Sequence, residues 1–116
     1  MKFYLGGYGD FDNMAKNVCK QYKKENPNCS LLFISPYLND KYFKNREFLK
    51  TEYDGIIYPD IENTPAKYAI LKRNQWMVKQ ADLIITYVNY SFGGASKSLE
   101  FAKKLNKTII NLGKQN

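Results

Sequence analysis

Short apolar runs alternate with longer amphipathic stretches along this chain, and the two kinds of segment have the lengths of strands and helices. The apolar runs predict five strands, at Phe3–Leu5, Leu31–Ile34, Gly55–Tyr58, Leu83–Val88 and Thr108–Leu112. The second run has no polar alternation, which is typical of a parallel strand that is buried on both faces. The fourth run is the clearest buried strand in the sequence.

Three amphipathic stretches predict helices between these strands. In residues 11–24 the apolar side chains recur at spacings of three and four, so they share one helical face. A second helix is expected from Pro65, a residue favoured in the first helical turn, to Gln80. A third is expected at 96–105, whereas residues 38–52 lack periodicity and predict a loop with at most one short helix. The inner face of the second helix is expected to carry Ala66, Ala69, Ile70, Met77 and Ala81.

The order of these segments predicts an α/β fold. Strands that alternate with helices form βαβ units, whose strands are parallel. A chain of 116 residues has room for one core. We therefore expect residues 1–116 to form a single Rossmann-like doubly wound domain, with a mostly parallel sheet of about five strands flanked by helices.

The composition excludes several kinds of site. The chain has no histidine, so His-based triads and imidazole metal sites are impossible. Cys19 and Cys29 are too few for a zinc site, and we expect both to be reduced, in a cytoplasmic protein. No apolar run approaches the ~20 residues of a membrane span. We expect no metal, no cofactor and no membrane contact.

The net charge of +7 favours anionic partners. The basic residues are spread along the chain, without the arm or stripe that tracks a nucleic acid duplex. We therefore expect a small anionic molecule rather than nucleic acid.

Two glycine-bearing turns follow predicted strands, at the carboxyl edge where parallel sheets bind ligands. The first contains Gly6, Gly7, Tyr8, Gly9 and Asp10. Glycine lets the backbone approach a ligand closely, although the same residues also suit a plain tight turn. In a nucleotide site Tyr8 would stack on a base, and Asp10 would accept a hydrogen bond from a ribose hydroxyl.

The second turn suits a phosphate. It comprises Gly93, Gly94, Ala95, Ser96, Lys97 and Ser98, at the start of a predicted helix. Helix-start amides, hydroxyl groups and an ammonium group together bind anionic oxygens. The spacing is not that of a Walker loop, and a serine here could simply cap the helix.

Two further charged residues, Glu100 and Arg73, each have a functional and a purely structural interpretation. Glu100 lies one helical turn after Ser96, where it could serve a ribose hydroxyl or act as a general acid or base, or simply pair with Lys103 or Lys104. Arg73 is either a solvated charge or a phosphate clamp. Trp76 and Met77 are expected in the core or in a homo-oligomer interface.

The segment 73–85, together with Gly93–Ala95 and 100–104, resembles the SLOG superfamily, and most of all its YpsA-like branch. That branch has an Arg-Asn-aromatic-Met run, an Asp-Leu-Leu-Ile strand and a Gly-Gly-Thr turn. The similarity covers roughly the last 45 residues well, and the first half in its strand-glycine turn and general layout. It implies a Rossmann-like nucleotide-binding domain, in a superfamily whose members commonly self-associate.

The LONELY GUY phosphoribohydrolases, another SLOG branch, imply a catalytic alternative. Their pattern puts Arg73 on the catalytic arginine and Glu100 on the catalytic glutamate, while Ser96 and Lys97 replace the family's Gly-Thr pair. The implied reaction is cleavage of the N-glycosidic bond of a nucleoside monophosphate. Nucleoside deoxyribosyltransferases are similar in layout, but Ser98 stands at the position of their nucleophilic glutamate.

The leading hypothesis from the sequence is binding of a nucleotide or a nucleotide-derived signal, for sensing or sequestration. The base, the number of phosphates and a cyclic or linear form all stay open.

Overall fold

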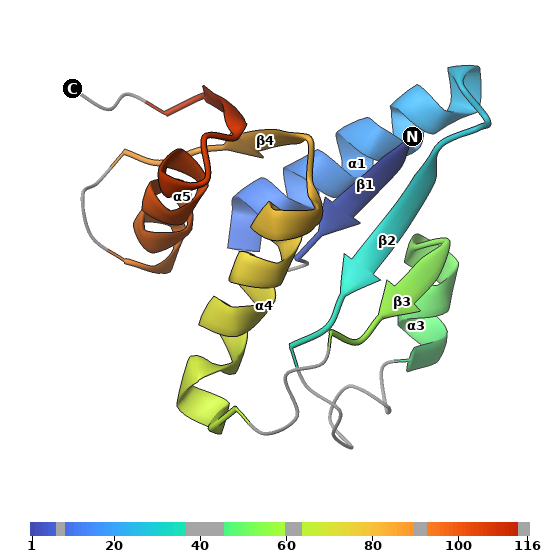
Figure 1. The fold of residues 1–116 in the computed structure, drawn as a ribbon. Coiled ribbons are helices and arrows are strands. Elements are labelled where there is room, and N and C mark those ends of the chain that lie inside the picture. The colour runs from blue at the N-terminus through green and yellow to red at the C-terminus, as the bar shows by residue number, and fades with distance from the viewer. Residues whose placement is uncertain (7–8, 37–45, 60–63, 90–92, 114–116) are drawn as a thin grey trace.

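The computed structural model describes residues 1–6, 9–36, 46–59, 64–89 and 93–113, and the predicted alternation of strands and helices is confirmed (Figure 1). The elements follow one another as β1 (Lys2–Leu5), α1 (Gly9–Glu25), β2 (Ser30–Ile34), α3 (Arg46–Glu52), β3 (Gly55–Ile57), α4 (Ala66–Gln80), β4 (Leu83–Thr86), α5 (Gly94–Lys104) and β5 (Thr108–Asn111).

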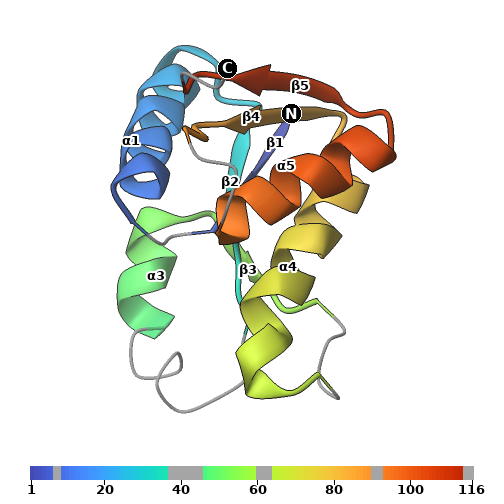
Figure 2. The ribbon, with the colours of Figure 1, turned by 90° about the vertical axis from the view of Figure 1, so that its left-hand side faces the viewer.

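The three strands β1, β2 and β3 form a central layer with helices on both sides. β1, β2 and β3 are parallel, in a register that pairs Tyr4 with Leu32 and Phe33 with Ile56. Figure 2 shows α1 and α3 on one side of the strands, and α4 and α5 on the other. The connections from β1 to β2 and from β2 to β3 step in the same direction across the parallel sheet, and right-handed crossovers of this kind put α1 and α3 on the same face.

The core lies on β2 and its neighbours. Leu31 is 2% exposed and Phe33 is 3% exposed, and both pack with Leu5 and Tyr53. The rings of Phe33 and Tyr53 lie 5.3 Å apart between centroids. The second strand is therefore buried as its unbroken apolar run predicts.

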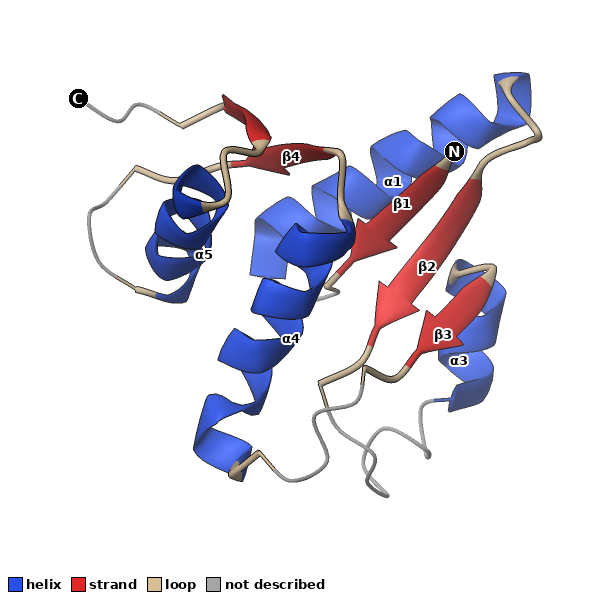
Figure 3. Cartoon of the chain, viewed as in Figure 1, coloured by secondary structure: helices blue, strands red, loops and turns tan. Residues whose placement is uncertain are grey.

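The expectation of one five-stranded sheet is wrong. β4 and β5 are parallel and pair Ile84 with Ile109, but among the described residues they form a separate two-stranded sheet (Figure 3). Beyond Thr86, the Val88 N–H donates to Asn111 Oδ1 at 2.9 Å. This hydrogen bond extends the contact between the two chain segments past the end of β4. In Figure 2 the β4–β5 pair runs across the direction of β1–β3, so β4 does not present its edge to β1.

The burial expected for the fourth strand is also wrong. Leu83, Ile85 and Tyr87 are each about half exposed, and they alternate with better covered residues. α5 packs against β4 and buries Leu99 and Ala102. The structure describes no helix on the opposite face of β4, and an apolar run cannot show on its own which of its faces will be covered.

The core position of Leu31 gives a first prediction. Leu31→Ala should lower the free energy of unfolding by about 2–5 kcal/mol, because it removes a buried side chain and leaves a cavity. Urea denaturation measures this change. Leu105→Ala, at an exposed leucine, should cost less than about 1 kcal/mol. Equal losses in the two variants would contradict this placement of the core.

Candidate functional site

Arg73 of α4 is buried at the carboxyl ends of the first two strands. Its side chain is 3% exposed, and Nη1 donates to the carbonyl oxygens of Gly6 (3.1 Å) and Ile34 (2.8 Å). Nε donates to Asn74 Oδ1 at 2.8 Å. The guanidinium therefore ties α4 to the ends of β1 and β2.

Gly6 allows this close approach. A Cβ added at Gly6 would lie 3.4 Å from three guanidinium atoms of Arg73, at the tight edge of ordinary contact. A larger side chain would press on the hydrogen bond that the Gly6 carbonyl accepts. The first glycine of the turn thus serves the backbone–arginine contact.

Asp12 lies close enough to Arg73 to be affected by its charge, Tyr53 lies close to Asp12, and Ser35 follows the strand end that Arg73 binds. Burial raises the pKa of Asp12, in the first turn of α1, while the positive charge of Arg73 acts to lower it. Burial also raises the pKa of Tyr53, and the Asp12 and Glu52 carboxylates add to that shift. Ser35 follows Ile34 and is 2% exposed. We call Asp12, Ser35, Tyr53 and Arg73 the Arg73 cluster.

The sequence pointed to only one member of this cluster. Arg73 was a candidate, whereas Asp12, Ser35 and Tyr53 were not. Ser35 could have been found, because it directly follows a predicted buried strand on the edge where ligands bind. No sequence signal marks Tyr53, since its partners come from distant segments.

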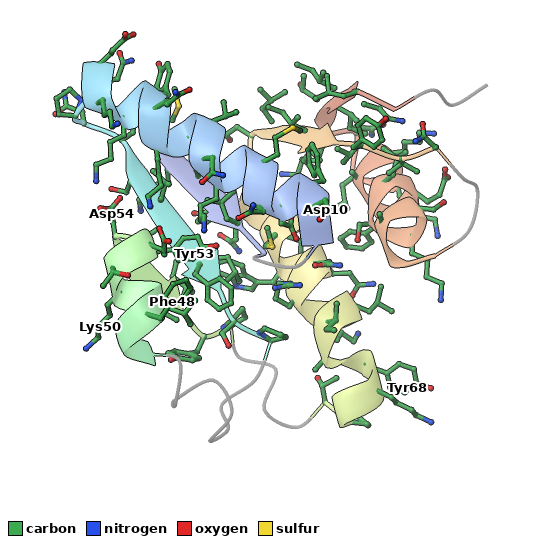
Figure 4. All side chains as sticks on the ribbon, turned by 180° about the vertical axis from the view of Figure 1, so that it is seen from behind. Asp10, Phe48, Lys50, Tyr53, Asp54 and Tyr68 are labelled. Carbon is green, nitrogen blue, oxygen red and sulfur yellow. The ribbon has the colours of Figure 1, made fainter. Side chains whose placement is uncertain are left out.

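The start of α1 carries negative charge. Asp10 is exposed in the first helical turn, and Asp12 lies in the same turn. Figure 4 shows Asp10 at the end of α1. These acids complement the positive end of the helix dipole and would repel a phosphate. Gly7 and Tyr8, two of the candidate ligand-binding residues, lie outside the described residues.

The start of α5 carries no acid. Gly93 is the N-cap residue with φ of 97°, a conformation that suits glycine, and no side chain caps the helix there. Added Cβ atoms at Gly93 and Gly94 would meet no described atom within 4 Å. Ala95 and Lys97 are exposed, and Ser96 is buried.

Ser98 is engaged within its own helix. Its Oγ donates to the Gly94 carbonyl at 3.1 Å. The Lys97 N–H donates to the Gly93 carbonyl at 3.1 Å, so the helical hydrogen bonds begin at that residue. The amides of Gly94, Ala95 and Ser96 precede it, which is where a helix has donors that its own carbonyls cannot satisfy.

The end of β1 and the start of α5 lie apart in the view of Figure 1 and overlap in the view of Figure 2, where α4 lies to one side of both.

Glu100 is exposed on α5, and its Oε1 lies 3.4 Å from Lys103 Nζ. This is the plain i,i+3 ion pair that helical spacing allows. The structure puts no other described ionisable group in an ion pair with Glu100. A general acid or base works best in an environment that adjusts its proton affinity, and the exposed position of Glu100 beside Lys103 is not such an environment.

Within the described part of the chain, no three His, Cys, Asp or Glu residues come together as metal ligands. No described helix combines the length and the apolar character needed to cross a membrane. Cys19 and Cys29 are both free thiols.

The bonds of Arg73 give a prediction on stability. Arg73→Lys should lower the free energy of unfolding by about 2–4 kcal/mol, because an ammonium group cannot reproduce the planar fork of donors and is left poorly paired in a buried position. Chemical denaturation measures it. Lys72→Ala, at the exposed neighbouring position, is the matched control and should change stability by less than about 0.5 kcal/mol.

Asp12 gives a prediction on pH dependence. The pKa of Asp12 is raised in the folded state, so between the ordinary pKa and the folded-state pKa the folded protein binds more protons than the unfolded chain does. The free energy of unfolding of wild type therefore falls as the pH rises through the folded-state pKa. The free energy of unfolding of Asp12→Asn, minus that of wild type, should therefore increase between about pH 3 and pH 7.

Asp54→Asn is the control of opposite sign. Lys23 and the Leu31 N–H lower the pKa of Asp54 in the folded state. The ionised Asp54 carboxylate therefore stabilises the fold above its ordinary pKa, and this stabilisation is lost as the pH falls through the folded-state pKa. The free energy of unfolding of Asp54→Asn, minus that of wild type, should decrease as the pH rises. A slope of the same sign in both variants would contradict the assignment.

Comparisons with known proteins identify no relative. No family model matches the chain, and neither a curated protein nor a solved structure matches it.

Proposed function

We propose that this protein binds a nucleotide or a nucleotide-derived anion, with a phosphate at the N-terminus of α5. The supporting observation is the contrast between the two glycine-led helix starts. α1 begins with two acids, whereas α5 begins with Gly93, Gly94 and an exposed Lys97, and has no acid in its first turn. Amide donors, the helix dipole and an ammonium group all favour an anion at α5.

Lys97, rather than Arg73, is the cation of this proposal. The guanidinium of Arg73 donates to two backbone carbonyls and is almost fully buried, so its hydrogen bonds already hold the end of β1. Arg73 acts on the ligand as a positioning residue, through the turn that begins at Gly6. This role differs from the direct phosphate clamp that its sequence position suggests.

The nucleoside would lie toward the first turn. Gly6, Gly7 and Tyr8 would face it, and Asp10, which is exposed, would accept a hydrogen bond from a ribose hydroxyl. The resemblance to SLOG domains agrees with this arrangement. We propose a cytoplasmic Rossmann-like module that senses or sequesters its ligand.

Hydrolysis of an N-glycosidic bond is the less favoured function. Its acid–base residue would be Glu100, which is exposed and paired with Lys103. Its phosphate-orienting residue would be Arg73, which is committed to backbone carbonyls. Incubation with a panel of nucleoside monophosphates tests it, and release of free base that Glu100→Gln abolishes would support the enzyme.

The binding proposal predicts a specific loss in two variants. Gly94→Val should lower affinity for nucleotides at least about tenfold, because its side chain would occupy the open space beside the first amides of α5. Lys97→Ala should lower affinity about three- to tenfold through the lost charge. Isothermal titration calorimetry with adenine and guanine mono- and diphosphates and a cyclic mononucleotide measures both.

The control is Lys104→Ala, which removes an exposed lysine from the last turn of the same helix. It should bind like wild type, and thermal unfolding should confirm that all three variants are folded. Equal weakening by Lys104→Ala would indicate general charge attraction. Failure of every tested nucleotide to bind wild type, with inorganic phosphate also inactive, would overturn the proposal.

A further inference from the structure

One face of the β4–β5 sheet is apolar and uncovered among the described residues. The parallel register pairs Leu83 with Thr108 and Ile85 with Ile110, so paired side chains lie on the same face. Tyr87 and Leu112 extend this face by one further alternate position. Its large apolar side chains, each 46–55% exposed, are Leu83, Ile85, Tyr87, Ile110 and Leu112. We call them the β4–β5 face.

The apolar surface continues onto α1. The rings of Tyr87 and Phe11 lie 6.1 Å apart between centroids. Met14 and Val18 follow Phe11 at three and seven positions along the helix, and they are 49% and 58% exposed. Two distant segments thus contribute to one apolar surface.

Trp76 and Met77 of α4 do not supply a comparable surface. Trp76 packs against Tyr4 with 5.6 Å between ring centroids, and both Trp76 and Met77 are only partly exposed. The β4–β5 face is therefore a better candidate for self-association than Trp76 and Met77.

The size of this surface matches the apolar part of a standard interface. Seven half-exposed apolar side chains present on the order of 400 Å² to solvent. A specific interface that buries ~800 Å² on each partner is about 57% apolar, which corresponds to about 450 Å². A patch of about this size is comparable to the largest apolar patch on a typical soluble protein, and such patches often have a function.

The charges favour a second copy as the partner. All the alternate positions on this side of the two strands, Thr108 included, are uncharged, in a chain whose net charge is +7. An acidic partner attracted by that charge would find nothing to pair with here. Two copies can meet through this face without bringing basic side chains together at its centre, and the same patch on both satisfies two-fold symmetry.

We propose that this protein forms a homodimer through the β4–β5 face, with the exposed apolar residues of α1 at its margin. The two sheets pack face to face, as in a β-sandwich, and bury both copies of Ile85 and Ile110. The proposal is independent of the ligand site, because the start of α5 lies outside this face.

Sedimentation equilibrium from about 1 to 100 µM tests the dimer, since a standard interface associates in or below this range. Wild type should have twice the mass of the 13.5 kDa chain. Ile85→Lys and Ile110→Lys should weaken association at least about 100-fold, because each would bury an unpaired ammonium group. Ile70→Lys, at an equally exposed isoleucine of α4, should leave the dimer intact.

A second measurement does not depend on the variants. The Tm of wild type should rise with protein concentration, as expected when folding is linked to dimerisation. A monomeric mass at every concentration with a constant Tm would overturn the proposal. So would a dimer that both β4–β5 lysine variants retain, or one that Ile70→Lys disrupts equally. Gly94→Val should remain dimeric, which separates this result from that of the nucleotide experiment.

Discussion

A buried arginine holds the carboxyl edge of the sheet together. The guanidinium of Arg73 carries a charge that burial would make very costly, so its donors must find acceptors in the fold. The carbonyl oxygens of Gly6 and Ile34 supply them, at the ends of two neighbouring strands. This requirement fixes α4 against β1 and β2 and brings Asp12 close to a positive charge.

The two glycine turns look alike in sequence but differ in electrostatics. The first leads into a helix whose opening turn contains Asp10 and Asp12, and its Gly6 carbonyl is bound by Arg73. The second leads into a helix without an opening acid or a side-chain cap. A helix start without its own counter-charge is the better place for an external anion. The proposed phosphate position depends on this difference.

The β4–β5 pair accounts for the main departure from a regular doubly wound sheet. Its strands are joined to each other and covered by α5 on one face, while the other face retains exposed apolar residues. Hydrophobic surface of this size is costly to leave in water. The proposed dimer would therefore explain why an apolar strand such as Leu83–Thr86 lies at the surface.

The sequence by itself determined the order and type of the elements other than α3, whose segment lacks periodicity, because apolar periodicity and proline and glycine positions are local signals. It also determined the burial of β2, whose unbroken apolar run suits a two-sided core. Tertiary structure alone decided that β4 pairs with β5 and not with β1, and which carbonyls Arg73 binds. Those outcomes depend on contacts between distant segments, and a local pattern cannot specify which partner a strand edge or a buried charge will meet.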